Sequence, residues 1–124
     1  MTPLIPSQIE ELYGSLRRVL HECPAAEIRT IAGGAGWDLA RIPDGIVSTG
    51  VTRPPIESAI DGQWAEWSNP EIRCARLRHL AYELIRFYGA KGMSAKVQQA
   101  IVKNGFRFEN GDFVPVDATG NIPD

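Results

Sequence analysis

Apolar residues recur at intervals of three and four along four stretches of this chain, which is the spacing of one face of an α-helix. Start signals precede two of them: Ser7 and Glu10 match a capping box, and Ser68-Asn69-Pro70-Glu71 is typical of a helix N-terminus. A run of glycines at 33–36 predicts a helix end. We therefore predict helices over Ser7–His21, from Pro24 to the glycines, over Thr52–Trp67 and over Pro70–Tyr88, the last of them central.

The segment from Ser94 to Val116 predicts a fifth helix followed by a β-hairpin. The helix spans Ser94–Lys103, because Gly105 favours the left-handed conformation of a helix end. Asn110-Gly111 between two strand-like runs indicates a two-residue turn, which pairs Glu109 with Asp112, Phe108 with Phe113 and Phe106 with Pro115. Because an isolated hairpin is only marginally stable in water, its phenylalanine face must dock on the helices.

Together these patterns predict a mainly α fold of about five helices with a C-terminal β-hairpin, a winged-helix-like ending. A chain of 124 residues suits one domain, 1–117, followed by a tail, 118–124, that we expect to fray. The hydrophobic fraction of 44% and the charged fraction of 23% are typical of a soluble globular protein. No apolar run approaches about 18 residues and the start lacks signal-peptide features, so we expect a cytoplasmic location.

Cysteines and histidines are too few and too scattered to indicate a metal centre. Cys23 and Cys74 stand alone, and His21 and His79 are the two histidines of the chain. Neither a paired-cysteine motif nor a cluster of carboxylates accompanies them. We therefore expect two buried thiols, with one disulfide as the alternative, and no metal or other cofactor.

Positive charge is concentrated in one part of a chain whose net charge is −2. Eight basic residues and one acidic residue, Glu83, lie between Arg73 and Arg107. Such a stretch suits an acidic protein surface or the phosphates of a nucleic acid. The residues expected to contact either partner are Arg73, Arg76, Arg86, Lys96, Gln99 and Lys103.

The order of a long helix, a turn, a second helix and a hairpin also matches a helix-turn-helix with a wing, which would bind DNA or RNA. In that arrangement Gln98 and Arg107 would be exposed beside the other polar residues of Ser94–Lys103, and glutamine can contact adenine edges. The acidic turn from Glu109 to Asp112 argues against this interpretation, because it would repel phosphate.

Arg73 and His79 resemble the R-x(4–6)-H motif of HEPN-type ribonucleases, in which His acts as acid or base and Arg holds the phosphate. An ordinary basic helix face is favoured instead, because Cys74 replaces the polar residue that usually follows the Arg. The six-residue spacing also sets the two side chains about 120° apart around a helix.

Two further patterns have a chemical and a structural interpretation. Gly33-Gly34-Ala35-Gly36 lacks the Lys-Ser/Thr of a phosphate-binding loop, so a helix end and close packing are favoured. Three tryptophans are more typical of a core than of a ligand cage, although Trp beside Arg is also typical of interface hot spots. They are Trp37, Trp64 and Trp67.

Four segments together resemble the small helical N-terminal domains of bacterial abortive-infection proteins of the AbiJ type: EIRTIAGGAGWDLARIP, TRPPIESAIDGQWAEW, LRHLAYELI and VQQAIVKNGFRFENGDFVPV, from Glu27 to Val116. The resemblance implies a sensing or adaptor module of antiphage defence without catalysis of its own. The basic character of the TRPP region in that family is matched here only by Arg53. The first three helices are similar to a death-like helical adaptor as well.

The sequence thus favours a non-enzymatic interaction or adaptor module that binds a protein partner or a second copy of itself. Binding of nucleic acid through the basic region of Arg73–Arg107 is the alternative, and a small ribonuclease that uses Arg73 and His79 is the third.

Overall fold

The computed structural model describes residues 4–38 and 53–117, and within them it contains five helices and one two-stranded antiparallel hairpin. This confirms the predicted mainly α fold with its C-terminal hairpin. The predicted tail, 118–124, and residues 39–52, which include the first position of the predicted helix Thr52–Trp67, lie outside the described residues. The elements are α1 (Pro6–His21), α2 (Ala25–Gly34), α3 (Arg53–Glu66), α4 (Pro70–Gly89), α5 (Ala95–Val102), β1 (Phe106–Glu109) and β2 (Asp112–Pro115).

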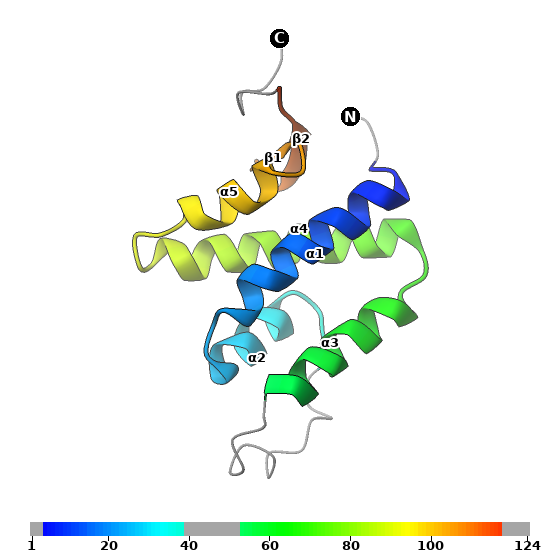
Figure 1. Cartoon of the computed structure of the whole chain (residues 1–124), viewed down its shortest axis with the longest axis vertical. Helices are drawn as coiled ribbons and strands as arrows, with labels where there is room; N and C mark the ends of the chain where they lie inside the picture. The colour runs from blue at the N-terminus through cyan, green and yellow to red at the C-terminus, as the bar shows by residue number, and fades with distance from the viewer. Residues whose placement is uncertain (1–3, 39–52, 118–124) are drawn as a thin grey trace.

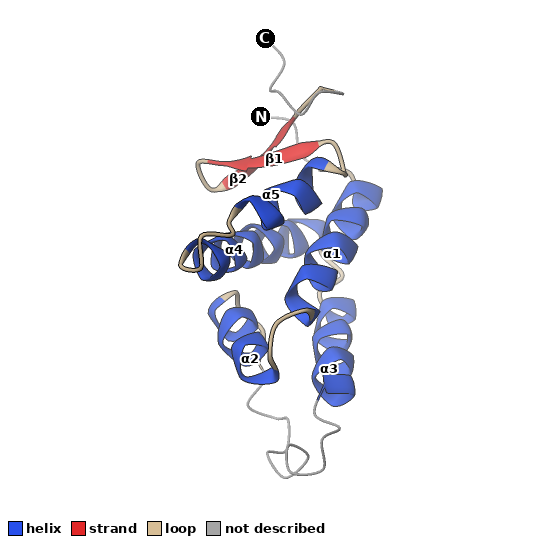
Figure 2. Ribbon diagram, turned by 60° about the vertical axis from the view of Figure 1, so that its left-hand side comes forward, coloured by secondary structure: helices blue, strands red, loops and turns tan. Residues whose placement is uncertain are grey.

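The longest helix, α4, lies at the centre of the fold, as the sequence predicts. It packs against α1, α2 and α5, and α1 crosses it in Figure 1. Figure 2 shows the hairpin and α5 at one end of the molecule and α2 and α3 at the other. The inward stripe of α4 is fully buried, so each helix that covers it contributes to one continuous core. That stripe consists of Leu77, Leu80, Ala81 and Leu84.

The observed ends of the helices test the capping residues and the glycine stop predicted from the sequence. Asn69 caps α4 as predicted, because its Oδ1 accepts a hydrogen bond of 2.8 Å from the Glu71 amide. The predicted capping box of α1 is wrong: the helix begins at Pro6, whose preset φ suits the first helical position, and Gln8 Oε1 accepts from the Ile5 amide at 3.0 Å. The glycine run at 33–36 ends α2 as predicted, with Gly34 as the last helical residue.

The hairpin has the predicted register, with Phe108 opposite Phe113 and Glu109 opposite Asp112. Asn110 and Gly111 have φ values of 53° and 79°, as a two-residue turn of the mirror-image type requires. The Phe108 and Phe113 rings pack edge to face, with centroids 5.3 Å apart. The phenylalanine face is buried on the helices, which confirms the predicted docking, although Pro115 at the strand end is exposed.

Gln98 fastens the hairpin to α5 with two hydrogen bonds. Its Nε2 donates to the Phe108 carbonyl at 2.8 Å, and its Oε1 accepts from the Phe108 amide at 3.0 Å. The side-chain amide thus pairs with β1 as a neighbouring strand would. The expectation that Gln98 is exposed is therefore wrong, because its donor and acceptor are both used by the backbone of Phe108.

We expect Gln98→Ala to lower the free energy of unfolding by about 1–3 kcal/mol, because it leaves the partly buried amide and carbonyl of Phe108 without partners. Gln99→Ala is the matched control, since Gln99 is exposed and should change stability by less than about 0.5 kcal/mol. Urea unfolding followed by circular dichroism measures both. Equal stability of the two variants would contradict this role of Gln98.

Candidate functional site

Three of the six predicted partner-binding residues lie together on one groove. Lys96, Gln99 and Lys103 share one face of α5, and a helical stripe of α1 faces them. The hollow has a volume of about 180 Å³. We call it the α1–α5 groove, and its lining residues are Ser15, Arg18, Val19, Glu22, Lys96, Gln99, Ala100 and Lys103.

The position of α5 beside α1 is set by an apolar face and by polar contacts at both ends of the helix. Val97 and Ile101 are fully buried beneath it. At one end Lys96 Nζ lies 2.6 Å from Glu22 Oε2, and at the other the Asn104 amide donates to the Ser15 hydroxyl at 2.8 Å. The two helices are therefore held in register along the length of the groove.

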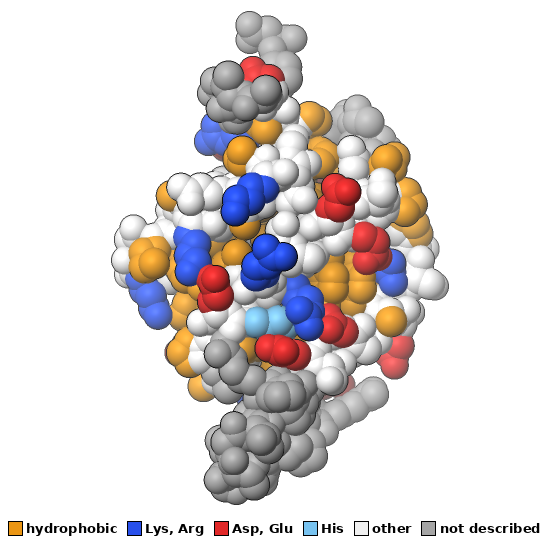
Figure 3. Space-filling view, in the orientation of Figure 1, with side chains coloured by type: hydrophobic (Ala, Val, Ile, Leu, Met, Phe, Trp, Pro, Cys, Tyr) orange, Lys and Arg blue, Asp and Glu red, His pale blue; other side chains and the backbone are white. Residues whose placement is uncertain are grey.

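The groove carries an excess of positive charge. Arg18 and Lys103 are exposed, and neither has an ion-pair partner within residues 4–38 and 53–117. Lys96 forms an ion pair with Glu22, whose side chain is 50% exposed, and its ammonium lies 5.4 Å from the centre of the Tyr88 ring. Such surface ion pairs contribute little to stability. Figure 3 shows the blue side chains gathered over α5 and the middle of α1. Three cations against one carboxylate make this surface suited to anionic groups.

Arg73, in contrast, is half-buried and is held by contacts to α1 and α3. Its guanidinium is ion-paired with Glu10, donates to the Trp64 carbonyl at 3.1 Å and lies 4.9 Å from the centre of the Trp64 ring. These contacts join α4 to α1 and α3. The sequence predicts Arg73 as a partner contact, whereas the structure shows its guanidinium bound to Glu10 and Trp64 of the protein itself.

Arg76 and Arg86 also lie away from the α1–α5 groove. Arg76 stacks on Trp67, with 5.0 Å between the guanidinium carbon and the ring centre, and its side chain lies where a Cβ on Gly36 would project. Arg86 is exposed near the end of α4, at a second groove between α2 and α4. The basic stretch of the sequence therefore does not form one surface, because the turns of α4 and α5 point its side chains in different directions.

The residues proposed for ribonuclease chemistry are not brought together in the described part of the chain. Arg73 points toward Glu10 and Trp64, whereas His79 is exposed on another side of α4. No contact between Arg73 and His79 is present there. The two side chains lie on different sides of α4, as the offset of about 120° between positions 73 and 79 predicts.

The glycine run serves close packing. A Cβ on Gly34 would lie 3.1 Å from the Glu83 carboxyl carbon, and a Cβ on Gly36 would lie 2.9 Å from Arg76 Nη1. A phosphate at Gly34 would meet a carboxylate at contact distance. Gly36 also has a φ of 108°, which favours glycine.

We expect Gly36→Ala to lower the melting temperature, because the new Cβ both clashes with Arg76 and requires a strained φ. Gly33→Ala is the control within the same run, since a Cβ there meets nothing within 4 Å and alanine favours a helix by about 0.5–1 kcal/mol. Thermal unfolding should therefore show changes of opposite sign. Equal melting temperatures for the two variants would contradict the packing role.

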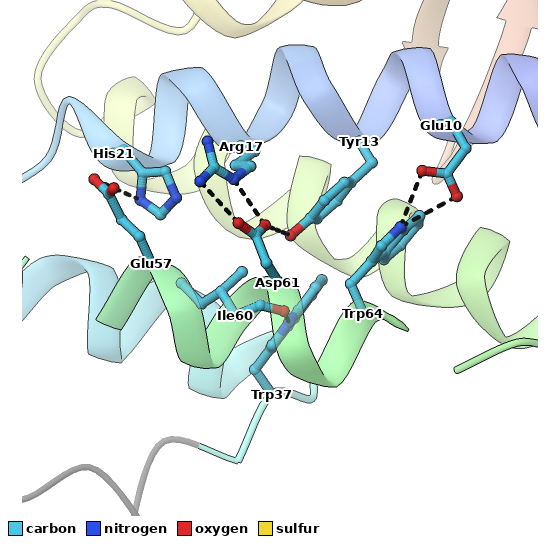
Figure 4. Close-up of polar contacts among 9 residues, drawn as sticks. All are labelled: Glu10, Tyr13, Arg17, His21, Trp37, Glu57, Ile60, Asp61 and Trp64. Carbon is cyan, nitrogen blue, oxygen red and sulfur yellow. Dashed lines mark hydrogen bonds and ion pairs between the residues drawn. The ribbon is translucent and has the colours of Figure 1, made fainter. Parts of the chain in front are cut away.

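Polar and aromatic side chains join α1 to α3, as Figure 4 shows. Arg17 donates two hydrogen bonds to Asp61, at 2.7 and 2.8 Å, and the Tyr13 hydroxyl donates to the same carboxylate at 2.6 Å. The Tyr13 ring stacks on Trp64 with 4.0 Å between centroids. We call Tyr13, Arg17, Asp61 and Trp64 the α1–α3 clasp.

The tryptophans belong mainly to the core. Trp64 and Trp37 are buried, and Trp37 Nε1 donates to the Ile60 carbonyl at 3.1 Å. Trp67 is half-buried and meets Trp37 edge to face, with centroids 4.9 Å apart. Trp37 and Trp67 thus link the α3 region to the segment after α2, whereas Trp64 packs on α1.

The α1–α3 clasp shifts the acidity of its members. Burial raises the pKa of the Tyr13 hydroxyl, and the hydrogen bond to Asp61 raises it further. Burial also acts to raise the pKa of Asp61, but hydrogen bonds from Arg17 and Tyr13 oppose it, and the net pKa lies below the usual value. The ionised form of Asp61 is therefore the one that the folded protein favours.

The pKa of Asp61 is lower in the folded protein than in the unfolded chain, where it is about 3.9. Ionised Asp61 therefore stabilises the folded protein fully above pH about 3.9, and this stabilisation is lost as the pH falls through the folded-state pKa. We expect Asp61→Asn to destabilise the protein at pH 7 by about 1 kcal/mol, and the deficit to shrink below pH about 4. Urea unfolding at a series of pH values measures this. Glu66→Gln, an exposed position on the same helix, should keep the wild-type pH profile.

The remaining side chains form no metal cluster in the part of the chain that the structure describes. Neither cysteine forms a disulfide in that part of the chain: Cys23 is buried, as predicted, and Cys74 is only half-buried. No helix within residues 4–38 and 53–117 has the length and apolar character of a membrane span.

Sequence reasoning missed Ser15, Arg18 and Glu22, which form one wall of the α1–α5 groove. Their spacing of three and four residues marks them as a polar stripe of α1, but no local signal says which helix lies beside it.

Comparison with known proteins found no matching family model, no matching curated protein and no matching solved structure.

Proposed function

We propose that this chain is a non-enzymatic interaction module that holds an acidic segment of a partner protein in the α1–α5 groove. The observation that carries the proposal is the placement of two exposed cations on the walls of the groove beside Lys96: Arg18 and Lys103, neither of which has an ion-pair partner among the described residues. A cytoplasmic role in antiphage defence follows as part of the proposal from the resemblance to AbiJ-type domains.

The groove offers carboxylates both charge and hydrogen bonds. Arg18 can bind a carboxylate through two parallel N–H groups, and Lys103 supplies a second cation on the opposite wall. A partner carboxylate that replaces Glu22 beside Lys96 exchanges one exposed ion pair for another at little cost. Ser15 and Gln99 add neutral donors between the cations.

Nucleic-acid binding is the second candidate, and two contacts and one further charge disfavour it. Gln98 is bonded to the backbone of Phe108, so it has no free edge with which to contact a base. Arg107 Nη2 lies 2.9 Å from Glu109 Oε1, so the wing's own cation is neutralised. Asp112 adds a second acid at the hairpin turn. A wing of this kind would repel a phosphate backbone.

We expect a fluorescein-labelled oligoglutamate peptide to bind the protein at low salt, and its affinity to fall about tenfold or more in Arg18→Glu and in Lys103→Glu. Each change removes an attractive charge and introduces a repulsive one, and tenfold corresponds to about 1.4 kcal/mol. Fluorescence anisotropy measures the binding, and labelled duplex DNA is titrated in parallel.

Lys91→Glu is the matched control, because it makes the same charge change outside the α1–α5 groove. The proposal is supported if only the two groove variants lose the peptide. Equal loss of peptide affinity in all three variants would show that net charge alone sets the affinity. It would overturn the assignment of the binding site to the α1–α5 groove. Tighter binding of duplex DNA than of the peptide, with a steep salt dependence, would replace the proposal with the nucleic-acid alternative.

A further inference from the structure

One side of α4 is largely exposed and amphipathic, and only at its C-terminal end, where Arg86 lines the groove with α2, does another described helix lie beside it. Its exposed or half-buried positions follow one another at intervals of three and four residues. Ile72 and Tyr82 are 42% and 55% exposed, which is high for large hydrophobic side chains. We call this the outer face of α4, and it consists of Ile72, Ala75, His79, Tyr82 and Arg86, with Glu71 at its edge.

The charges at the two ends of this face are opposite and unpaired. Glu71 and Arg86 are both exposed, and neither side chain has an ion-pair partner within residues 4–38 and 53–117. They lie about 22 Å apart along the helix, at a rise of 1.5 Å per residue. The outer face therefore has a negative end and a positive end, separated by a mostly uncharged middle.

Such a face is complementary to itself in one orientation. If a second copy of α4 lies antiparallel, with the two-fold axis beside His79, Glu71 of each copy meets Arg86 of the other. The same axis sets Tyr82 of one copy beside Ala75 of the other, so that a large ring meets a small side chain. A parallel arrangement would bring like charges together at both ends, so the charges select the antiparallel one.

We propose that the outer face of α4 is the interface of a symmetric homodimer of this chain, with the two α4 helices antiparallel. The partner is a second copy because turning α4 end to end about His79 places each charge opposite an opposite charge and the large Tyr82 opposite the small Ala75. An isologous interface requires such a self-complementary surface. Tyr82 is the central anchor, in keeping with the enrichment of tyrosine in such interfaces.

This interface is independent of the α1–α5 groove, since α1 and α5 cover other sides of α4. One helix face buries less than the roughly 1,600 Å² of a standard protein–protein interface. We therefore expect a dimer that dissociates in the micromolar range, and a concentration series is needed to observe it.

Sedimentation equilibrium of the wild-type chain should show a monomer–dimer equilibrium. Glu71→Arg and Arg86→Glu should each weaken the dimer about tenfold or more, because each variant creates two like-charge contacts across the two-fold axis. An equimolar mixture of the two variants should form a heterodimer, since every contact is then again between opposite charges. The double variant should recover the homodimer for the same reason.

Glu11→Arg is the control for charge alone, because Glu11 is exposed on α1 and lies outside the outer face; it should dimerise like the wild type. Circular dichroism checks that each variant is folded. A wild-type chain that stays monomeric up to millimolar concentration overturns the proposal. So does a wild-type dimer that survives both single reversals, since it would use another surface. Oligoglutamate binding should be unchanged in Glu71→Arg, which separates this result from the test of the groove.

Discussion

The burial of the inward stripe of α4 is the constraint on which the other features of this protein depend. One helix of 20 residues carries a row of leucines that three neighbours must cover. Each fully buried leucine contributes about 1.5–3 kcal/mol, so this arrangement outweighs the preferences of any single surface residue. Once α1, α2 and α5 cover α4 from different sides, the positions of its polar residues follow from the helical repeat. Arg73 is thereby turned toward Glu10, while Arg86 is left exposed.

Local sequence signals were sufficient for the elements of the fold. Asn110-Gly111 defines the register of the hairpin, and Asn69 defines the start of α4, because each acts through backbone atoms a few residues away. The start of α1 was predicted one residue late, since Pro6 and Gln8 serve where Ser7 and Glu10 were expected. Signals of this kind reach about one helical turn.

Contacts between distant parts of the chain were outside the reach of those signals. Arg17 and Asp61 are 44 positions apart, and nothing near either residue marks the other as its partner. Lys96, Gln99 and Lys103 were predicted as a surface, but Arg18 was not, because its place in the groove depends on how α5 lies on α1. Charge counting likewise overstated the basic region, since it treats an arginine stacked on Trp64 or Trp67 as equal to an exposed one.

The α1–α3 clasp has a consequence for the order in which parts of the molecule open. α3 is joined to α1 by long polar and aromatic side chains, whereas α1, α4, α5 and the hairpin share closely packed backbones. Hydrogen bonds and ion pairs weaken in acid or salt more readily than apolar contacts do. Although Ile56 and Ile60 of α3 are buried in the common core, the polar part of its attachment means that the amide hydrogens of α3 should exchange with solvent through partial opening before those of α4 do.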